Sequence, residues 1–198
     1  MRSGKKYLAL DMGAESGRGM VGILDNGRLT LEETHRFLNE PVFMAGALRW
    51  NLPGQFSALK ASLGAAIKKV GPIQSLGVDT WGVDYVLYRR ATGQAVRLPY
   101  NYRDVRTADI PEKVFKTISR SDIYNRTGIQ FMNLNTLYQL VAHKEQHPED
   151  FDDSILLFIP DALTNYLNGE FTCEYTIAST SNLLNPNTRD WDFELIEQ

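Results

Sequence analysis

Several features that mark other classes of protein are missing from this sequence. Its 198 residues include a single cysteine, Cys173, which excludes an intrachain disulfide and leaves metal binding open. No apolar run comes near the roughly 20 residues that a membrane-spanning helix requires. The basic start at residues 1–6 is followed by a short apolar run that meets Asp11, so a secretory signal peptide is not expected. We therefore expect a cytoplasmic protein without a membrane partner.

An excess of charge of one sign is also missing. Lys and Arg number 21 against 24 Asp and Glu, which gives a formal net charge of −3. This balance provides no general attraction to nucleic acid or to an anionic membrane, although net charge does not exclude a local basic patch. The apolar content of 43% and the aromatic content of 11% suffice for a sizeable core, so we expect one folded domain over residues 1–198. The oligomeric state stays open.

The most informative segment lies at residues 7–18. A short apolar run ends at Asp11, a turn bracketed by Gly13 and Gly17 follows, and a second apolar run begins after Arg18. This pattern predicts a strand, a tight turn and a second strand. We expect the glycines to give the turn backbone angles closed to other residues and its amides to form a concavity suited to phosphate. The carboxylate at the tip of the first strand could hold the magnesium that accompanies nucleotide phosphates.

Two considerations limit what this segment establishes by itself. It is not a Walker loop, because Gly-Lys-Ser/Thr is absent and a strand rather than a helix follows. An ordinary hairpin, whose aspartate and glycines serve only the turn, explains the pattern equally well.

A second polar turn follows a buried-looking strand at residues 74–79. The strand ends in Asp79, and Trp81, Gly82 and Asp84 come directly after it. Carboxylates beside an aromatic wall suit a ligand rich in hydroxyl groups. Each residue also has a structural alternative, because Trp81 could belong to the core and the two aspartates could bind backbone groups or Arg103.

Hydrophobic periodicity predicts the remaining elements. We expect strands at 6–11, 18–25 and 28–34, an irregular stretch at 39–50, a helix from 54 that ends at Gly71-Pro72, and strands at 74–79 and 83–89. Later helices are expected at 111–118, 134–146 and 161–167, with a strand at 155–159. The order indicates the α/β class and a ribonuclease-H-like (actin-like ATPase) fold, a mixed sheet flanked by helices. The helix between the third and fourth strands suits a parallel pairing of those two strands.

Further runs complete a characteristic order. They are Tyr-Arg-Asp-x-Arg-Thr at 102–107, the segment 124–131, Asn-Thr-Leu-Tyr-Gln-Leu at 135–140, Pro-Asp at 160–161, Leu-Asn-Gly at 167–169 and Glu-Tyr-Thr at 174–176. Taken together, nearly the whole chain resembles the N-terminal lobe of the FGGY carbohydrate kinases. The runs at 79–84 and 102–107 most resemble those of the rhamnulokinases. The first motif is shared with many actin-like ATPases and says little about the substrate.

The resemblance implies an ATP site and a sugar site. The phosphates of ATP would lie on the turn, and Asp11 would hold Mg²⁺, mostly through water; the residues of that turn are Gly13, Ala14, Glu15, Ser16, Gly17 and Arg18. The sugar would lie against Gly82, where a side chain would collide with it, with Trp81, Asp84, Arg103 and Gln130 as neighbours. The implied reaction is phosphorylation of a ketose, in the first place L-rhamnulose to L-rhamnulose 1-phosphate. L-Fuculose, L-ribulose and D-xylulose are the alternative substrates.

In this family the catalytic base is an aspartate at the start of a second lobe, which we expect to lie beyond Gln198. Residues 1–198 alone are therefore expected to have little or no kinase activity. Two other classes stay open. One is a non-catalytic module that binds sugar or nucleotide. The other is an actin-like ATPase of the chaperone or cytoskeletal kind, which would not explain the run at 79–84.

Two details complete the sequence evidence. Rhamnulokinases usually have a small hydroxyl residue at the position of Glu15, and a carboxylate beside triphosphate is repulsive unless it points outward or helps to hold magnesium. His143 and His147 have the i, i+4 spacing of a helical metal site. The zincin arrangement requires a glutamate directly after the first histidine, and Lys144 stands there; Pro148 also lies at the helix end, so a metal site is not expected.

Overall fold

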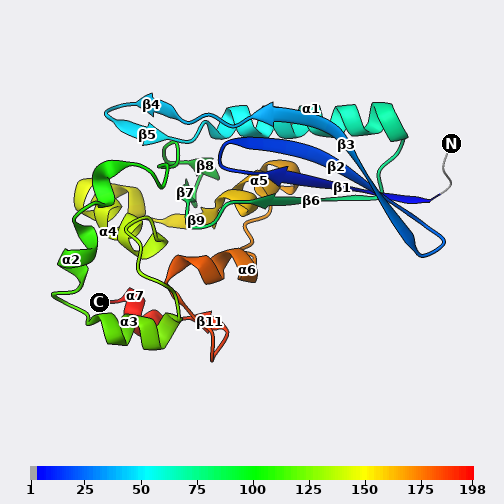
Figure 1. Ribbon diagram of the computed structural model, residues 1–198. Helices are drawn as coiled ribbons and strands as arrows, with labels where there is room; N and C mark the ends of the chain where they lie inside the picture. The colour runs from blue at the N-terminus through cyan, green and yellow to red at the C-terminus, as the bar shows by residue number, and fades with distance from the viewer. Residues whose placement is uncertain (1–3) are drawn as a thin grey trace.

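The computed structural model describes residues 4–198, so Met1, Arg2 and Ser3 of the basic start lie outside the described residues. Figure 1 shows an elongated sheet with α1 and α5 at one end of the molecule and a group of helices at the other. The strands are β1 (Lys5–Met12), β2 (Ser16–Asp25), β3 (Arg28–Leu38), β4 (Val42–Met44), β5 (Ala47–Arg49), β6 (Ser75–Thr80), β7 (Tyr85–Arg89), β8 (Gln94–Ala95), β9 (Ser154–Phe158), β10 (Leu184–Asn185) and β11 (Asp190–Trp191). The helices are α1 (Leu52–Val70), α2 (Ile110–Val114), α3 (Arg120–Thr127), α4 (Thr136–Gln146), α5 (Ile159–Asn168), α6 (Tyr175–Ala178) and α7 (Phe193–Ile196), with short 3₁₀ turns at Val105–Thr107, Pro148–Phe151 and Ser179–Ser181.

The main sheet has the strand order β3-β2-β1-β6. β1, β2 and β3 pair antiparallel, and β6 pairs parallel with β1. The expected pairing of the third strand with the fourth was therefore wrong, although the two strands do run in the same direction. β3 carries the exposed charges of Glu33 and Arg36, which suits an edge strand, whereas β1 lies between β2 and β6 in the sheet.

Helix α1 confirms the predicted helix and crosses from β3 to β6. It begins where the Asn51 side chain accepts a hydrogen bond from the backbone N–H of Gly54 at 3.1 Å, and it ends at Gly71, whose φ of 81° is open to glycine. Leu59 and Ala66 are fully buried against the sheet. Ile67 of the same helix is 47% exposed.

The core of the main sheet lies on one face. Leu8 and Leu10 of β1 pack with Leu59 of α1 and Leu163 of α5 in a single apolar cluster. On the other face, alternate residues such as Tyr7 and Ala9 are exposed and line a shallow hollow. Helices α1 and α5 therefore lie together on one side of the mixed sheet.

The rest of the chain forms a second, mostly helical part. After β6 the chain leaves the main sheet. β7 then pairs antiparallel with both β8 and β9, with Tyr85 opposite Phe158. Helix α2 is shorter than expected and α3 was not anticipated. A hairpin, β4–β5, occupies the stretch expected to be irregular. Across residues 4–198, no helix combines the length and the apolar character needed to cross a membrane.

Candidate active site

Charged residues meet where β1 and β6 end and β2 begins. Asp11 of β1 lies opposite Arg18 of β2 and, across the parallel pair, opposite Asp79 of β6. Nε and Nη2 of Arg18 both lie 2.8 Å from Oδ2 of Asp11. Both side chains keep about two fifths of their surface exposed, at 45% and 40%. The predicted magnesium ligand is therefore held by an arginine of the predicted phosphate turn.

The turn at residues 13–16 is closed by a hydrogen bond from the Gly13 N–H to the Ser16 carbonyl at 2.9 Å. Neither glycine has a positive φ, so the expectation of unusual backbone angles was wrong. Close packing requires them instead. A Cβ at Gly13 would lie 2.9 Å from the Ser16 oxygen, and a Cβ at Gly17 would overlap the ring of Phe37.

Two residues that sequence reasoning missed support this turn. Asn39 is buried, and its side-chain amide donates to the Gly13 carbonyl at 2.9 Å while its backbone N–H donates to the Glu15 carbonyl at 2.9 Å. Gln55 of α1 donates in turn to the Asn39 Oδ1 at 3.0 Å. The only available signal was a polar residue directly after β3, too weak to identify a role.

The second polar turn surrounds Asp84, which is 1% exposed. Its Oδ2 accepts hydrogen bonds from the indole N–H groups of Trp50 at 2.5 Å and Trp81 at 2.9 Å and from the Tyr102 backbone N–H at 3.2 Å. Its Oδ1 accepts one from Gln139 at 2.7 Å. Burial raises the pKa of Asp84 to about 6, although these hydrogen bonds act in the opposite direction. Asp84 is thus fully engaged within the chain, by one backbone N–H, as the structural alternative expected, and by three side chains that it did not name.

Trp81 lies beside a second tryptophan that the sequence did not single out. The ring centroids of Trp50 and Trp81 are 4.1 Å apart at an interplanar angle of 37°. Trp50 is fully buried, whereas Trp81 is half-buried. Asp84 therefore fixes both indoles, and Trp81 presents the accessible one.

Gly82 has a reason to be glycine inside the chain itself. A Cβ there would lie 2.9 to 3.1 Å from three side-chain atoms of Thr180. Gly82 and Thr180 also line a hollow of about 580 Å³ with Asp79, Thr80 and Asp161. Asp161 is 7% exposed, and burial raises the pKa of its carboxyl to about 6.

Arg103 and Gln130, the other two predicted sugar neighbours, do not share the contacts that join Trp81 to Asp84. Arg103 is exposed and forms an ion pair with Glu15 of the phosphate turn at 3.6 Å. Gln130 is exposed, and its backbone carbonyl accepts a hydrogen bond from Asn135 at 2.7 Å. Within residues 4–198, no hydrogen bond or ion pair joins the Gln130 side chain to Trp81, Asp84 or Arg103.

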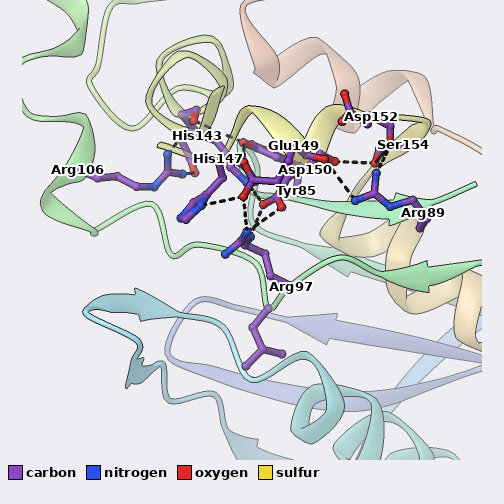
Figure 2. A network of polar contacts seen from close by, with 12 residues as sticks. Tyr85, Arg89, Arg97, Arg106, His143, His147, Glu149, Asp150, Asp152 and Ser154 are labelled. Carbon is purple, nitrogen blue, oxygen red and sulfur yellow. Dashed lines mark hydrogen bonds and ion pairs between the residues drawn. The ribbon is translucent and has the colours of Figure 1, made fainter. Parts of the chain in front are cut away.

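His143 lies in a buried polar network (Figure 2). Its Nδ1 lies 2.9 Å from the Tyr85 hydroxyl and its Nε2 lies 2.8 Å from Oδ2 of Asp150, so both ring nitrogens have partners. Arg97 also binds Asp150. Burial lowers the pKa of His143 to about 4, which keeps the ring neutral. The histidine therefore serves the packing between α4 and β7.

Comparisons with known proteins agree with this geometry. Residues 6–198 match the model of the FGGY family of carbohydrate kinases, N-terminal domain. The rhamnulokinase of Bacteroides thetaiotaomicron is 40% identical over 194 residues, which cover 98% of this chain and 40% of that protein. The rhamnulokinase of Pectobacterium atrosepticum is 42% identical over 200 residues, which cover 98% of this chain and 39% of that protein. The chain thus spans about 40% of the length of the curated relatives it matches.

Solved structures give the same fold. A gluconate kinase from Lactobacillus acidophilus superposes with a TM-score of 0.86 at 18% identity, covering 98% of this chain and 39% of the other. A ligand-bound xylulose kinase from the same organism gives a TM-score of 0.85 at 18% identity, with the same coverage. At this identity the likeness concerns the fold, and it confirms the ribonuclease-H-like α/β class. Because the family match extends over residues 6–198, the chain belongs to the FGGY family of carbohydrate kinases and corresponds to its N-terminal domain.

Proposed function

We propose that residues 1–198 form the N-terminal lobe of an ATP-dependent kinase that converts L-rhamnulose to L-rhamnulose 1-phosphate. The observation that carries this proposal is an identity of 40% with a protein named rhamnulokinase over 98% of this chain. The arrangement of an acidic strand end, a tight glycine turn and a half-buried tryptophan supports it. We expect the protein to act in the cytoplasm, where ATP is available.

The nucleotide side of the site is proposed to be the turn at residues 13–18. Its backbone and Arg18 would bind the phosphates, and Asp11 would hold Mg²⁺. No group of three His, Cys, Asp or Glu side chains capable of holding a metal occurs within residues 4–198, so the ion would take most of its ligands from water and phosphate, as magnesium commonly does. A phosphate oxygen would offer Arg18 a second partner and leave Asp11 free for the metal. The bound ion would neutralise the charge that develops on the transferred phosphoryl group.

The sugar side is proposed to include Gly82, Trp81, Arg103 and Gln130. Asp84 has a different role in this proposal, because its hydrogen bonds hold Trp50 and Trp81 in place rather than reach a ligand. The base that accepts the proton of the sugar hydroxyl is proposed to lie in a second lobe, which the family resemblance implies. Phosphoryl transfer would then depend mainly on how the two lobes position the reactants.

The substrate is tested by steady-state kinetics of the natural protein, including all sequence that follows Gln198. Magnesium-ATP is supplied with L-rhamnulose, L-fuculose, L-ribulose or D-xylulose, and the phosphorylated product is identified by ³¹P NMR. We expect kcat/KM for L-rhamnulose to exceed that for each other ketose by at least about tenfold. A higher value for another ketose would reassign the substrate. Binding of sugar or nucleotide without turnover would support the non-catalytic module.

The Asp11→Asn variant tests the nucleotide side of the proposed site. It should lower kcat by at least about tenfold while the KM for the ketose stays near the wild-type value, because the substitution removes the proposed metal ligand and the charge that pairs with Arg18 but no proposed sugar contact. Unchanged kcat would contradict the assignment of Asp11.

A further inference from the structure

Val83 has a backbone conformation that β-branched residues rarely adopt. Its φ is 68°, in the left-handed region. The backbone N–H of Asp84 donates to the Gly82 carbonyl at 2.9 Å, so the two residues that flank Val83 are joined across it. A hydrogen bond between residues i and i+2 around a central residue of positive φ is the arrangement of the γ-turn that is rare and strained. The turn therefore needs support from the rest of the chain.

Side chains from two distant segments bind the backbone of Val83. Its N–H donates to Oγ1 of Thr180 at 3.1 Å. Its carbonyl accepts a hydrogen bond from Oγ1 of Thr136 at 2.7 Å and a longer one from Nε2 of Gln139 at 3.4 Å. Both backbone polar groups of the strained residue are thus satisfied by side chains.

The two threonines are themselves fixed. Thr136 is fully buried in the first turn of α4. Oγ1 of Thr180 donates to the Ile177 carbonyl at 2.8 Å, which leaves its lone pairs for the Val83 N–H. Gln139 adds a link to the tryptophan pair, since the same Nε2 lies 2.7 Å from Oδ1 of Asp84.

The supported turn lies where the sugar is proposed to bind. Gly82 precedes Val83 and lines the hollow of about 580 Å³, and Thr180 lines the same hollow. Strained backbone that the surrounding structure holds in place is frequently found at functional sites. A relaxed turn at this position would move the Gly82 backbone and the Trp81 ring relative to the hollow.

We propose that Thr180 and Thr136 are positioning residues, whose hydroxyl groups hold the strained Val83 turn so that Gly82 and Trp81 are pre-organised for the sugar. This rests on the proposed function, in that it assigns a task to residues around the proposed ketose site. Neither hydroxyl has to contact the sugar for this task.

The first test compares Thr180→Val, which removes the hydroxyl and keeps the shape, with Thr180→Ser, which keeps the hydroxyl. In the natural full-length kinase, we expect Thr180→Val to raise the KM for the ketose about tenfold and to leave the KM for ATP unchanged. Thr180→Ser should stay within about twofold of wild type. The control is Thr92→Val, because the Thr92 hydroxyl also accepts a backbone hydrogen bond, from Gln94 at 3.3 Å, but in the β7–β8 turn. It should change neither KM.

The second test is rescue. Glycine adopts a positive φ without strain, so Val83→Gly should restore most of the ketose affinity when it is combined with Thr180→Val. If Thr180 contributed only packing, glycine at position 83 would not restore the ketose affinity. An unchanged ketose KM in Thr180→Val, or a double variant no better than the single one, would overturn the proposal.

A spectroscopic readout separates this proposal from the proposed function. Trp50 and Trp81 have ring centroids 4.1 Å apart, so their coupled transitions should give a circular dichroism couplet. Thr180→Val should alter the couplet and the double variant should restore it, with or without kinase activity. A wild-type protein that phosphorylates no ketose but shows these changes would refute the function and leave the support of the turn intact. A couplet that does not respond to Thr180→Val would refute the role of Thr180 even in an active kinase.

Discussion

Nη2 of Arg103 lies 3.6 Å from Oε1 of Glu15, so an ion pair joins the proposed sugar loop to the proposed phosphate turn. The family resemblance implies a small hydroxyl residue at the position of Glu15. The pair gives this carboxylate a partner. Its side chain is 86% exposed and that of Arg103 is 45% exposed, so the pair contributes at most about 1 kcal/mol to stability.

Glu15→Ser tests whether the carboxylate takes part in nucleotide binding. Removing a negative charge beside triphosphate should leave the affinity for magnesium-ATP equal or better. The measurement is a calorimetric titration of the complete enzyme, with Glu15→Gln as the variant that keeps the size and removes the charge. A marked loss of affinity in both variants would show instead that Glu15 helps to hold the metal.

Gly82→Ala tests the contact between residues 82 and 180. The added methyl group meets Thr180 at 2.9 to 3.1 Å, so we expect a loss of about 1–3 kcal/mol in the free energy of unfolding, measured in urea. Thr180→Ser removes one of the crowded atoms and keeps the hydroxyl, so the double variant should recover part of the stability.

Kinetics of the same double variant separate the two reasons for glycine at position 82. If the sugar also needs that space, stability recovers while the KM for the ketose stays high. Recovery of both would assign the glycine to Thr180 alone. A Gly82→Ala protein as stable as wild type would contradict the contact.

Asp84 should make a distinctive contribution to the pH dependence of stability. Its folded pKa of about 6 lies above the ordinary value near 4, so the folded state binds the proton more tightly. The contribution of Asp84 to stability is therefore greatest below pH 4 and falls by about 3 kcal/mol as the pH rises through 6. We expect the difference in unfolding free energy between wild type and Asp84→Asn to decrease over this range. A difference that stays constant or increases from pH 4 to pH 7 would contradict the raised pKa.

His143 should act in the opposite direction. Its folded pKa of about 4 lies below the ordinary value near 6.5, so the unfolded chain takes up the proton first as the pH falls. The stabilisation is present above pH 6.5 and is lost, by about 3 kcal/mol, as the pH falls to 4. His143→Gln keeps a donor and an acceptor but does not titrate, so wild type should lose stability relative to this variant on acidification. Unfolding free energies are measured in urea from pH 7 to pH 4. If they change with pH equally in wild type and in His143→Gln, the histidine is not buried as a neutral ring.

The sequence was most informative where the evidence is local. The apolar runs of β1 and β2 and the hydrophobic periodicity of α1 predicted their elements to within a few residues. The β4–β5 hairpin was missed because its strands are only three residues long, because Phe43 is 76% exposed, and because one of the two buried residues of β5 is the charged Arg49, so the sequence shows no apolar alternation. The partner of β6 was also misassigned, because helix α1 fixes the direction of the strand but not its neighbour.

The candidate site shows the same difference between local signals and contacts that only the fold creates. Asp11 and the glycine turn could be identified from adjacent residues. The contact of Thr180 with Val83 spans 97 positions along the chain, and no periodicity connects them. The need for glycine at 13 and 17 was predicted correctly but for a reason that the structure replaces: the neighbours are the Ser16 carbonyl and the Phe37 ring, and only the folded chain brings Phe37 there.

The most direct measurement is a coupled ADP-release assay with magnesium-ATP and L-rhamnulose, performed on residues 1–198 and on the natural protein with the sequence that follows Gln198. We expect turnover only in the longer protein, because the base is proposed to lie in a second lobe. Turnover by residues 1–198 alone, or none on any ketose by either protein, would contradict the proposal that this chain is the first lobe of a rhamnulose kinase.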